Sequence, residues 1–201
     1  MFELYTESAR RVLFFARYEA SEKGSTAIGT EHLLLGLLRG GRGVVSHVLS
    51  ASNVAAESVR QEIDRRIVGG EKIPTSVEIP FSTESIIVLR YAAEEADRLS
   101  HNYIGPEHLL LALVRQEGSI AGSVLSDRGL RIDAAREAVI RTLADPATRT
   151  LKSRAEAAEH LDLLKQLVDQ LAGTPGNGAA ARVLVQRIHF SLDRLRTMLN
   201  G

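Results

Sequence analysis

The chain has 201 residues, of which 44% are hydrophobic, and its 25 lysines and arginines balance its 25 aspartates and glutamates. That apolar share excludes disorder throughout, and the zero formal charge excludes a global field that would collect nucleic acid or hold an anionic membrane. The absence of cysteine excludes disulfides, thiolate catalysis and cysteine-ligated zinc. Because residues 1–7 lack a signal region and no apolar run is long enough to span a bilayer, we expect a cytoplasmic protein.

Residues 1–68 are predicted to form the first of two helical domains. Apolar residues recur at three- and four-residue spacing and alternation of β-branched residues is scarce, which favours helices over strands. The pattern predicts four helices, near residues 6–23, 30–40, 43–51 and 55–68. Residues 69–80 follow as an extended linker, because they contain a glycine pair and two prolines.

The second domain, residues 81–145, is a duplicate of the first. A shift of 76 places residues 5–67 on 81–143 without a gap, and 19 of the 63 pairs are identical. Four more helices are therefore predicted, near 82–99, 106–116, 119–127 and 132–145. The period is too long for a solenoid repeat, so each copy is expected to be a small helical unit.

The remaining residues, 146–201, are predicted to form a helical hairpin. Two amphipathic stretches, each with one apolar stripe, flank a turn that is rich in glycine. Each stripe needs a partner, and two alternatives stay open: packing onto the two repeats, or a homodimer or other partner surface. The predicted fold is thus all-α, with two pseudo-symmetric four-helix repeats followed by this hairpin.

The chain contains no motif for nucleotide, metal or nucleophilic chemistry. The nearest approach to a phosphate loop, Gly40-Gly41-Arg42-Gly43, lacks the lysine and the hydroxyl and is typical of a turn between helices. His32 and His108 do not belong to a His-Glu-x-x-His array, so we interpret them as structural residues. We expect no enzyme, no cofactor and no metal.

Glu31 and Glu107 are the candidate binding residues, and both are predicted in the first turn of the second helix of their repeat. A carboxylate there interacts favourably with the helix dipole, by about 0.3–1 kcal/mol when exposed. A helix start with a glutamate beside it also offers amide donors to a phosphate and an acceptor to a cation. The structural and the functional interpretation both stay open on the residues alone.

The Gly-Thr-Glu-His-Leu-Leu-Leu-Gly-Leu motif at 29–37, its echo at 105–113 and the Tyr5-Thr6-Glu7 opening resemble the Clp N-terminal repeat domain. The resemblance covers residues 2–145. Because the sequence contains no phosphate loop of an ATPase module, it implies a stand-alone form of this domain without the ATPase modules. It implies a module that binds a Clp-family unfoldase, its substrates or its adaptors.

The resemblance also implies ligands. In ClpC-like proteins the glutamate of the motif helps to bind phosphorylated arginine, so Glu31 and Glu107 would hold the guanidinium, while Thr30 and backbone amides would meet the phosphate. Pro106 replaces the threonine in the second repeat and has no N–H, which weakens that site.

A second binding face is implied at Phe2 and Phe81, which open the two repeats. Aromatic residues at these places contribute to the surface that binds cyclic-peptide antibiotics in related domains, although core anchoring is an equal alternative. Two functions follow as hypotheses: an adaptor or regulator that recognises marked proteins, or a sequestering factor that binds cyclic peptides and protects the Clp machine.

Overall fold

The computed structural model describes residues 3–41, 43–67, 69–74 and 76–145, together with the single residues Ile188 and Leu192. The chain divides into two compact units, Met1–Ala144 and Asp145–Gly201. The predicted hairpin belongs to the second unit and lies outside the described residues, as does Phe2.

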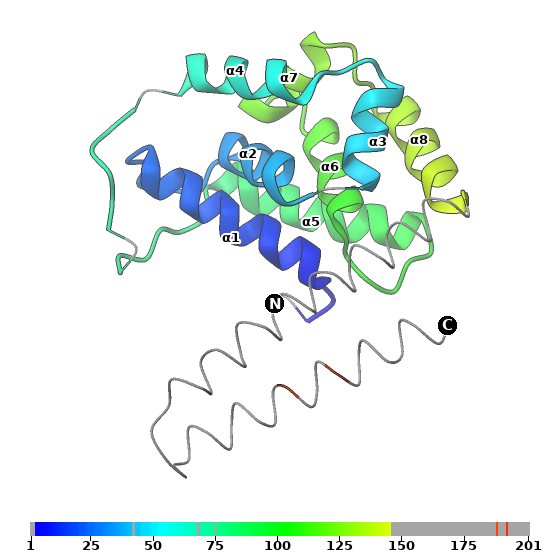
Figure 1. The fold of residues 1–201 in the computed structure, drawn as a ribbon, viewed down its shortest axis with the longest axis horizontal. Coiled ribbons are helices and arrows are strands. Elements are labelled where there is room, and N and C mark those ends of the chain that lie inside the picture. The colour runs from blue at the N-terminus through cyan, green and yellow to red at the C-terminus, as the bar shows by residue number, and fades with distance from the viewer. Residues whose placement is uncertain are drawn as a thin grey trace. The chain divides into compact units, whose positions relative to one another are not determined.

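The described part of the first unit is all-helical, as predicted (Figure 1). The first repeat contains α1 (Glu7–Glu22), α2 (Thr30–Gly40), α3 (Val44–Ala51) and α4 (Ala56–Arg66). The second contains α5 (Thr83–Arg98), α6 (Pro106–Arg115), α7 (Ile120–Asp127) and α8 (Ile132–Ala144). Each helix begins and ends within two residues of its prediction, and the pseudo-symmetric pair of four-helix repeats is confirmed.

Hydroxyl side chains fix the starts of three helices. Thr6, Ser82 and Ser119 stand immediately before α1, α5 and α7, and each side-chain oxygen accepts a hydrogen bond from a backbone N–H of the first turn. Such a cap satisfies a donor that has no partner within the helix and is worth about 1 kcal/mol.

The two repeats contribute to one hydrophobic core. Helix α2 of the first repeat packs on α7 of the second, while α3 packs on both α6 and α8. Two short parallel bridges also cross between the repeats, Tyr5 with Ile104 and Ile28 with Phe81. Each repeat therefore covers apolar surface that the other exposes, and the second helix of each repeat lies at the centre. The largest fully buried apolar side chains of these two helices are Leu33, Leu34, Leu35, Leu37, Leu109, Leu110, Leu111 and Leu113.

Each repeat also buries a glutamate between two arginines. Glu95 on α5 is fully buried and accepts two hydrogen bonds of 2.8 Å from the guanidinium of Arg136 on α8, with Arg115 on α6 at 3.5 Å. Burial alone would raise the pKa of Glu95, but Arg136 lowers it below its ordinary value. The first repeat has the same three residues at the positions shifted by 76: Glu19, Arg39 and Arg60.

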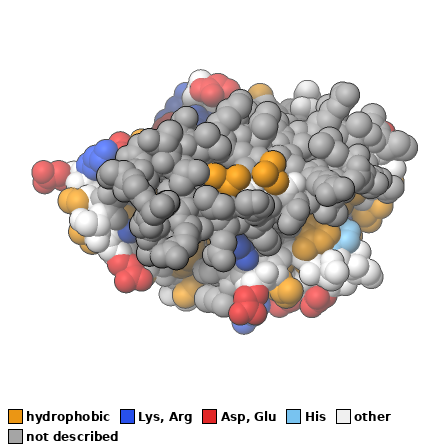
Figure 2. All heavy atoms as spheres, turned by 60° about the horizontal axis from the view of Figure 1, so that its bottom comes forward, with side chains coloured by type: hydrophobic (Ala, Val, Ile, Leu, Met, Phe, Trp, Pro, Cys, Tyr) orange, Lys and Arg blue, Asp and Glu red, His pale blue; other side chains and the backbone are white. Residues whose placement is uncertain are grey.

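The surface of the described residues is mixed in character. Figure 2 shows one face, on which hydrophobic, basic and acidic side chains are interspersed wherever described atoms are visible. None of the described helices combines the length and the apolar character needed to cross a membrane.

Candidate functional site

The starts of α2 and α6 are built alike, around a histidine in the third position of the helix. His32 is 1% exposed, and its Nδ1 accepts the N–H of Gly29 at 3.0 Å. Because Nδ1 is an acceptor, the proton of the neutral ring is on Nε2, which lies 3.1 Å from the hydroxyl oxygen of Ser25. Burial, with a smaller contribution from the charge of Lys23, lowers the pKa of His32 to about 4. His32 is therefore neutral at physiological pH and organises the start of α2.

The second repeat has the same arrangement with one change. The Nδ1 of His108 accepts the N–H of Gly105 at 2.8 Å, and its Nε2 lies 2.8 Å from Nδ1 of His101. His101 stands at the position that Ser25 occupies in the first repeat. It is half-buried and stacks on Tyr103, with ring centroids 5.0 Å apart.

Glu31 lies at the second position of α2, and its carboxylate folds back toward the residue before the helix. A Cβ added to Gly29 would come within 2.1 Å of Oε1 of Glu31, so a side chain at position 29 would make this carboxylate move. The side chain is 15% exposed, and burial raises the pKa of Glu31. Its Oε1 is 3.2 Å from Nδ1 of His32, but this contact is not an ion pair because His32 is neutral and its Nδ1 already accepts a hydrogen bond.

Among the described residues, no lysine or arginine pairs with Glu31. The carboxylate instead lies beside the N-terminus of α2. The backbone amides of His32 and Leu33 donate to the carbonyl of Gly29, and the amides of Thr30 and Glu31 come before them in the helix. A partly open carboxylate at a helix start can accept from a cationic donor, and helix-start amides can donate to an anion. The Glu31 carboxylate also accepts from its own backbone amide and from the Thr30 hydroxyl.

Glu107 occupies the equivalent position on α6 but is closed off. It is 1% exposed, and its Oε1 has no hydrogen-bond partner among the described residues. A Cβ on Gly105 would come within 2.5 Å of both carboxylate oxygens, so this side chain folds back in the same way. The first residue of α6, Pro106, supplies no N–H. The two motifs are thus alike in sequence and different in access.

Thr30 does not present its hydroxyl to solvent. It is 3% exposed, and its Oγ1 accepts the N–H of Ala121, in the first turn of α7, at 3.4 Å. The threonine therefore ties α2 to the other repeat, and its hydroxyl also hydrogen-bonds to the Glu31 carboxylate.

Phe81 lies at the entry to the second repeat and is half-buried beside the core. The backbone around it is held by two bonds to Ile28, which donates to the carbonyl of Pro80 at 2.7 Å and accepts from Ser82 at 3.0 Å. The predicted partner of Phe81 in a binding face, Phe2, lies outside the described residues.

Sequence reasoning missed an apolar pocket between α1 and the linker. Phe14 is 66% exposed, Val77 47% and Tyr18 37%, and together they surround a cavity of about 80 Å³. The other lining residues are Arg17, Ser21, Pro74 and Ile79. One signal was available, because Phe14 lies on the side of α1 opposite to Val12 and Ala16, which are core residues.

The fold and these paired helix starts define a small, all-helical duplicated domain. A family model, the Clp repeat (R) N-terminal domain, matches residues 4–86 and again 80–170. The chain belongs to this family.

The similar proteins are much longer than this chain. An ATP-dependent Clp protease ATP-binding subunit ClpA homologue from Guillardia theta is 42% identical over 147 residues, which are 73% of this chain and 18% of that protein. The ClpC/MecB negative regulator of genetic competence from Bacillus subtilis is 36% identical over 148 residues, 74% of this chain and 18% of that protein. The chain spans less than a fifth of the length of these relatives.

Solved structures agree with the fold. The N-terminal domain of the chaperone ClpD from Arabidopsis thaliana superposes with a TM-score of 0.57 at 28% identity, covering 71% of this chain and 99% of that one. The N-terminal domain of Hsp104 from Candida albicans gives a TM-score of 0.59 at 17% identity, covering 71% and 93%, and supports the fold alone.

Proposed function

We propose that this chain is a non-catalytic, cytoplasmic module that binds proteins handled by a Clp-family unfoldase, or the adaptors of that unfoldase, and that the start of α2 recognises phosphoarginine. The observation that carries the proposal is the carboxylate of Glu31. It is partly buried, partly open, and pairs with no lysine or arginine of the described residues.

The chemistry of phosphoarginine fits this helix start. The ligand joins a guanidinium portion to a phosphate, so a receptor needs an acceptor for one and clustered donors for the other. Glu31 supplies the acceptor, and the first amides of α2 supply donors at the positive end of the helix dipole. Burial raises the pKa of Glu31, so the carboxylate gains from a cationic donor that replaces its lost hydration.

The second repeat is expected to be the weaker site. Pro106 removes one amide, and the burial of Glu107 leaves its carboxylate out of reach unless the start of α6 opens. We therefore expect a single phosphoarginine to bind per chain at low ligand concentration.

Calorimetric titration of the full chain with phosphoarginine and with phosphoserine tests this function. Both ligands offer phosphate to the amides, but only phosphoarginine offers a guanidinium, and a hydrogen bond to a charged group is worth about 1.5–3 kcal/mol. Phosphoarginine should therefore bind roughly tenfold or more tightly. The Glu31→Ala change should remove that preference.

Two matched variants serve as controls for this titration. Glu107→Ala should have a smaller effect than Glu31→Ala, and Glu57→Ala, at an exposed first-turn position of α4, should have none. Equal affinity for the two ligands, or undiminished binding by the Glu31 variant, would contradict the proposed recognition.

The second candidate function is capture of cyclic or apolar peptides, and the pocket at Phe14, Tyr18 and Val77 supports it. Ile79 lines this pocket and leads directly to Phe81 along the chain. A Phe14→Ser variant should lose peptide binding while keeping phosphoarginine binding, which separates the two functions.

A further inference from the structure

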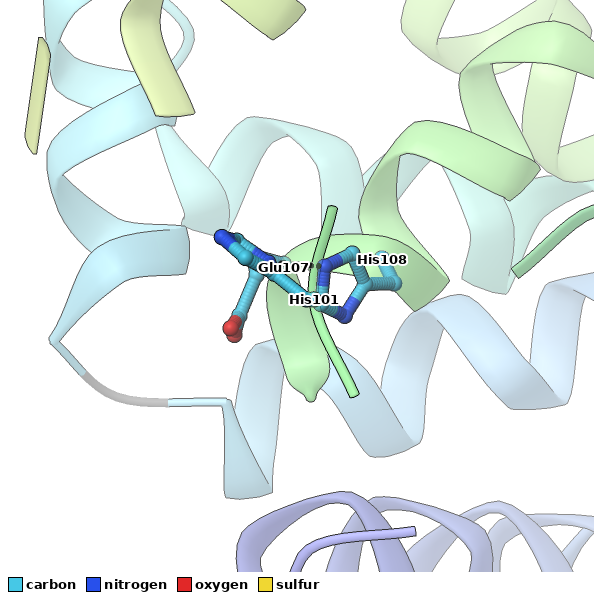
Figure 3. Close-up of side chains that lie close together, drawn as sticks. All are labelled: His101, Glu107 and His108. Carbon is cyan, nitrogen blue, oxygen red and sulfur yellow. Dashed lines mark hydrogen bonds between the residues drawn. The ribbon is translucent and has the colours of Figure 1, made fainter. Parts of the chain in front are cut away.

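The start of α6 gathers three side chains with metal-ligating atoms. His101, Glu107 and His108 each offer one such atom, and these atoms lie within 4.8 Å of one another (Figure 3). His101 comes from the loop after α5, whereas the other two lie in the first turn of α6. The sequence indicated no metal site because the helix carries no His-x-x-x-His array, and only the fold brings His101 to His108.

Two features of this cluster point to a cation. The Oε1 of Glu107 is buried without a hydrogen-bond partner among the described residues, which is costly for a carboxylate oxygen. The two imidazoles share a hydrogen bond of 2.8 Å, so Nδ1 of His101 turns its lone pair toward Nε2 of His108, and both nitrogens become ligand atoms once that proton moves. Imidazole nitrogens and a carboxylate are the ligands that Zn²⁺ takes in sites with three protein ligands, where water fills the fourth position.

We propose that His101, Glu107 and His108 form a Zn²⁺ site in the second repeat. Bonds of about 2.0–2.2 Å in tetrahedral geometry place ligand atoms roughly 3.3–3.5 Å apart. The two nitrogens must separate slightly and the carboxylate must approach them. His101 can make this adjustment because it lies in a loop and is half-buried.

Binding requires one proton to move. His108 accepts the Gly105 N–H on Nδ1, so its proton is on Nε2 and points to His101. When Zn²⁺ takes Nε2, the proton passes to Nδ1 and the Gly105 N–H gives up its bond to the ring. No proton leaves the protein, and the lost bond makes this site weaker than a structural zinc site with four protein ligands.

The first repeat is an internal control. Its residues at the positions shifted by 76 are Ser25, Glu31 and His32, so it has the same helix start without the second imidazole. We therefore expect one ion per chain, held by the second repeat. This site is independent of the proposed phosphoarginine recognition at Glu31.

Calorimetric titration of the chelator-treated full chain with ZnCl₂ tests the site. The expected result is one ion per chain, with affinity reduced about tenfold or more by His101→Ser, which copies the first repeat, and by Glu107→Gln. His47→Ala, an exposed histidine at the start of α3, should bind Zn²⁺ as the unmodified chain does. In NMR spectra, Zn²⁺ should shift the Gly105 amide and leave the Gly29 amide in place.

A gain-of-function variant decides the matter should the loss variants fail to fold. Ser25→His supplies the missing imidazole to the first repeat and should add a second ion. Failure to gain that ion, absence of Zn²⁺ binding by the unmodified chain, or binding that survives both His101→Ser and Glu107→Gln would overturn the assignment.

Discussion

His32 and Glu31 are neighbours in the motif, and burial favours the neutral form of both. It lowers the pKa of His32 to about 4 and raises the pKa of Glu31. The neutral histidine is required because its Nδ1 accepts the N–H of Gly29. The Glu31 carboxylate accepts hydrogen bonds from its own backbone amide and from the Thr30 hydroxyl, which lower its pKa but do not offset the effect of burial.

The histidine makes the stability of the fold depend on pH. An unfolded histidine has a pKa near 6.5, so between about pH 6.5 and 4 the unfolded chain binds a proton that the folded chain does not. The contribution of His32 is complete above pH 6.5 and is lost as the pH falls toward 4, by roughly 3 kcal/mol in total.

Urea unfolding at pH 7.5 and pH 4.5 measures this loss. The His32→Asn variant should lose less stability than the unmodified chain over that interval, because asparagine does not titrate. His47→Ala, at an exposed position, should keep the full dependence. A His32→Asn variant with the same pH dependence as the unmodified chain would show that another group is responsible.

At the scale of elements, the buried glutamates hold three helices together in each repeat. Glu95 joins α5 to α6 and α8 through Arg115 and Arg136, at distances of 2.8–3.5 Å. The corresponding distances from Glu19 to Arg39 and Arg60 are longer, 3.6 and 3.8 Å. We therefore expect the stability of the second repeat to depend more strongly on its buried glutamate and two arginines.

Removing Glu95 costs the hydrogen bonds that its carboxylate accepts, about 1.5–3 kcal/mol for bonds to a charged group, because Arg115 keeps Glu94 at 2.7 Å and Arg136 keeps Asp133 at 3.0 Å. Glu95→Ala should lower the free energy of unfolding by about this amount, and Glu19→Ala by clearly less, as measured by urea unfolding at pH 7.5. Equal losses in the two variants would contradict the inference from the distances.

The helices could be predicted from the sequence because apolar spacing and turn residues are local signals. The sequence also carried a signal for these groups of one glutamate and two arginines, since Glu19, Arg39 and Arg60 all recur at the shift of 76. That signal does not say that the three residues meet, because they come from different helices. The same shift aligns His101 with Ser25, but it does not show that these residues lie beside His108 and His32.

Access to the candidate site could not be predicted. Glu31 and Glu107 share the same motif, yet one is 15% exposed along its side chain and the other 1% exposed overall. The difference arises from what packs around each helix start, which local sequence does not encode. The contact of the Thr30 hydroxyl with α7 likewise arises from tertiary packing, and its role toward a phosphate stays a prediction.

At the scale of the whole molecule, the two repeats form one folding unit. Helices of each repeat pack on the other, and the first compact unit ends at Ala144. A chain truncated after Asp145 should therefore fold and melt cooperatively on its own.

Calorimetry of the fragment 1–145 checks this expectation against the full chain. A cooperative transition within a few degrees of the one in the full chain is the expected result. A fragment that does not fold would show that residues 146–201 contribute to the core of the repeats.

We propose that the start of α2 is a receptor site for phosphoarginine, whereas the start of α6 is not. NMR mapping of backbone amides during titration of the full chain with phosphoarginine tests it most directly. We expect saturable shifts at Thr30, Glu31 and His32, with much smaller ones at Glu107 and His108. Shifts centred on α6, on the pocket at Phe14, or on neither helix start would contradict it.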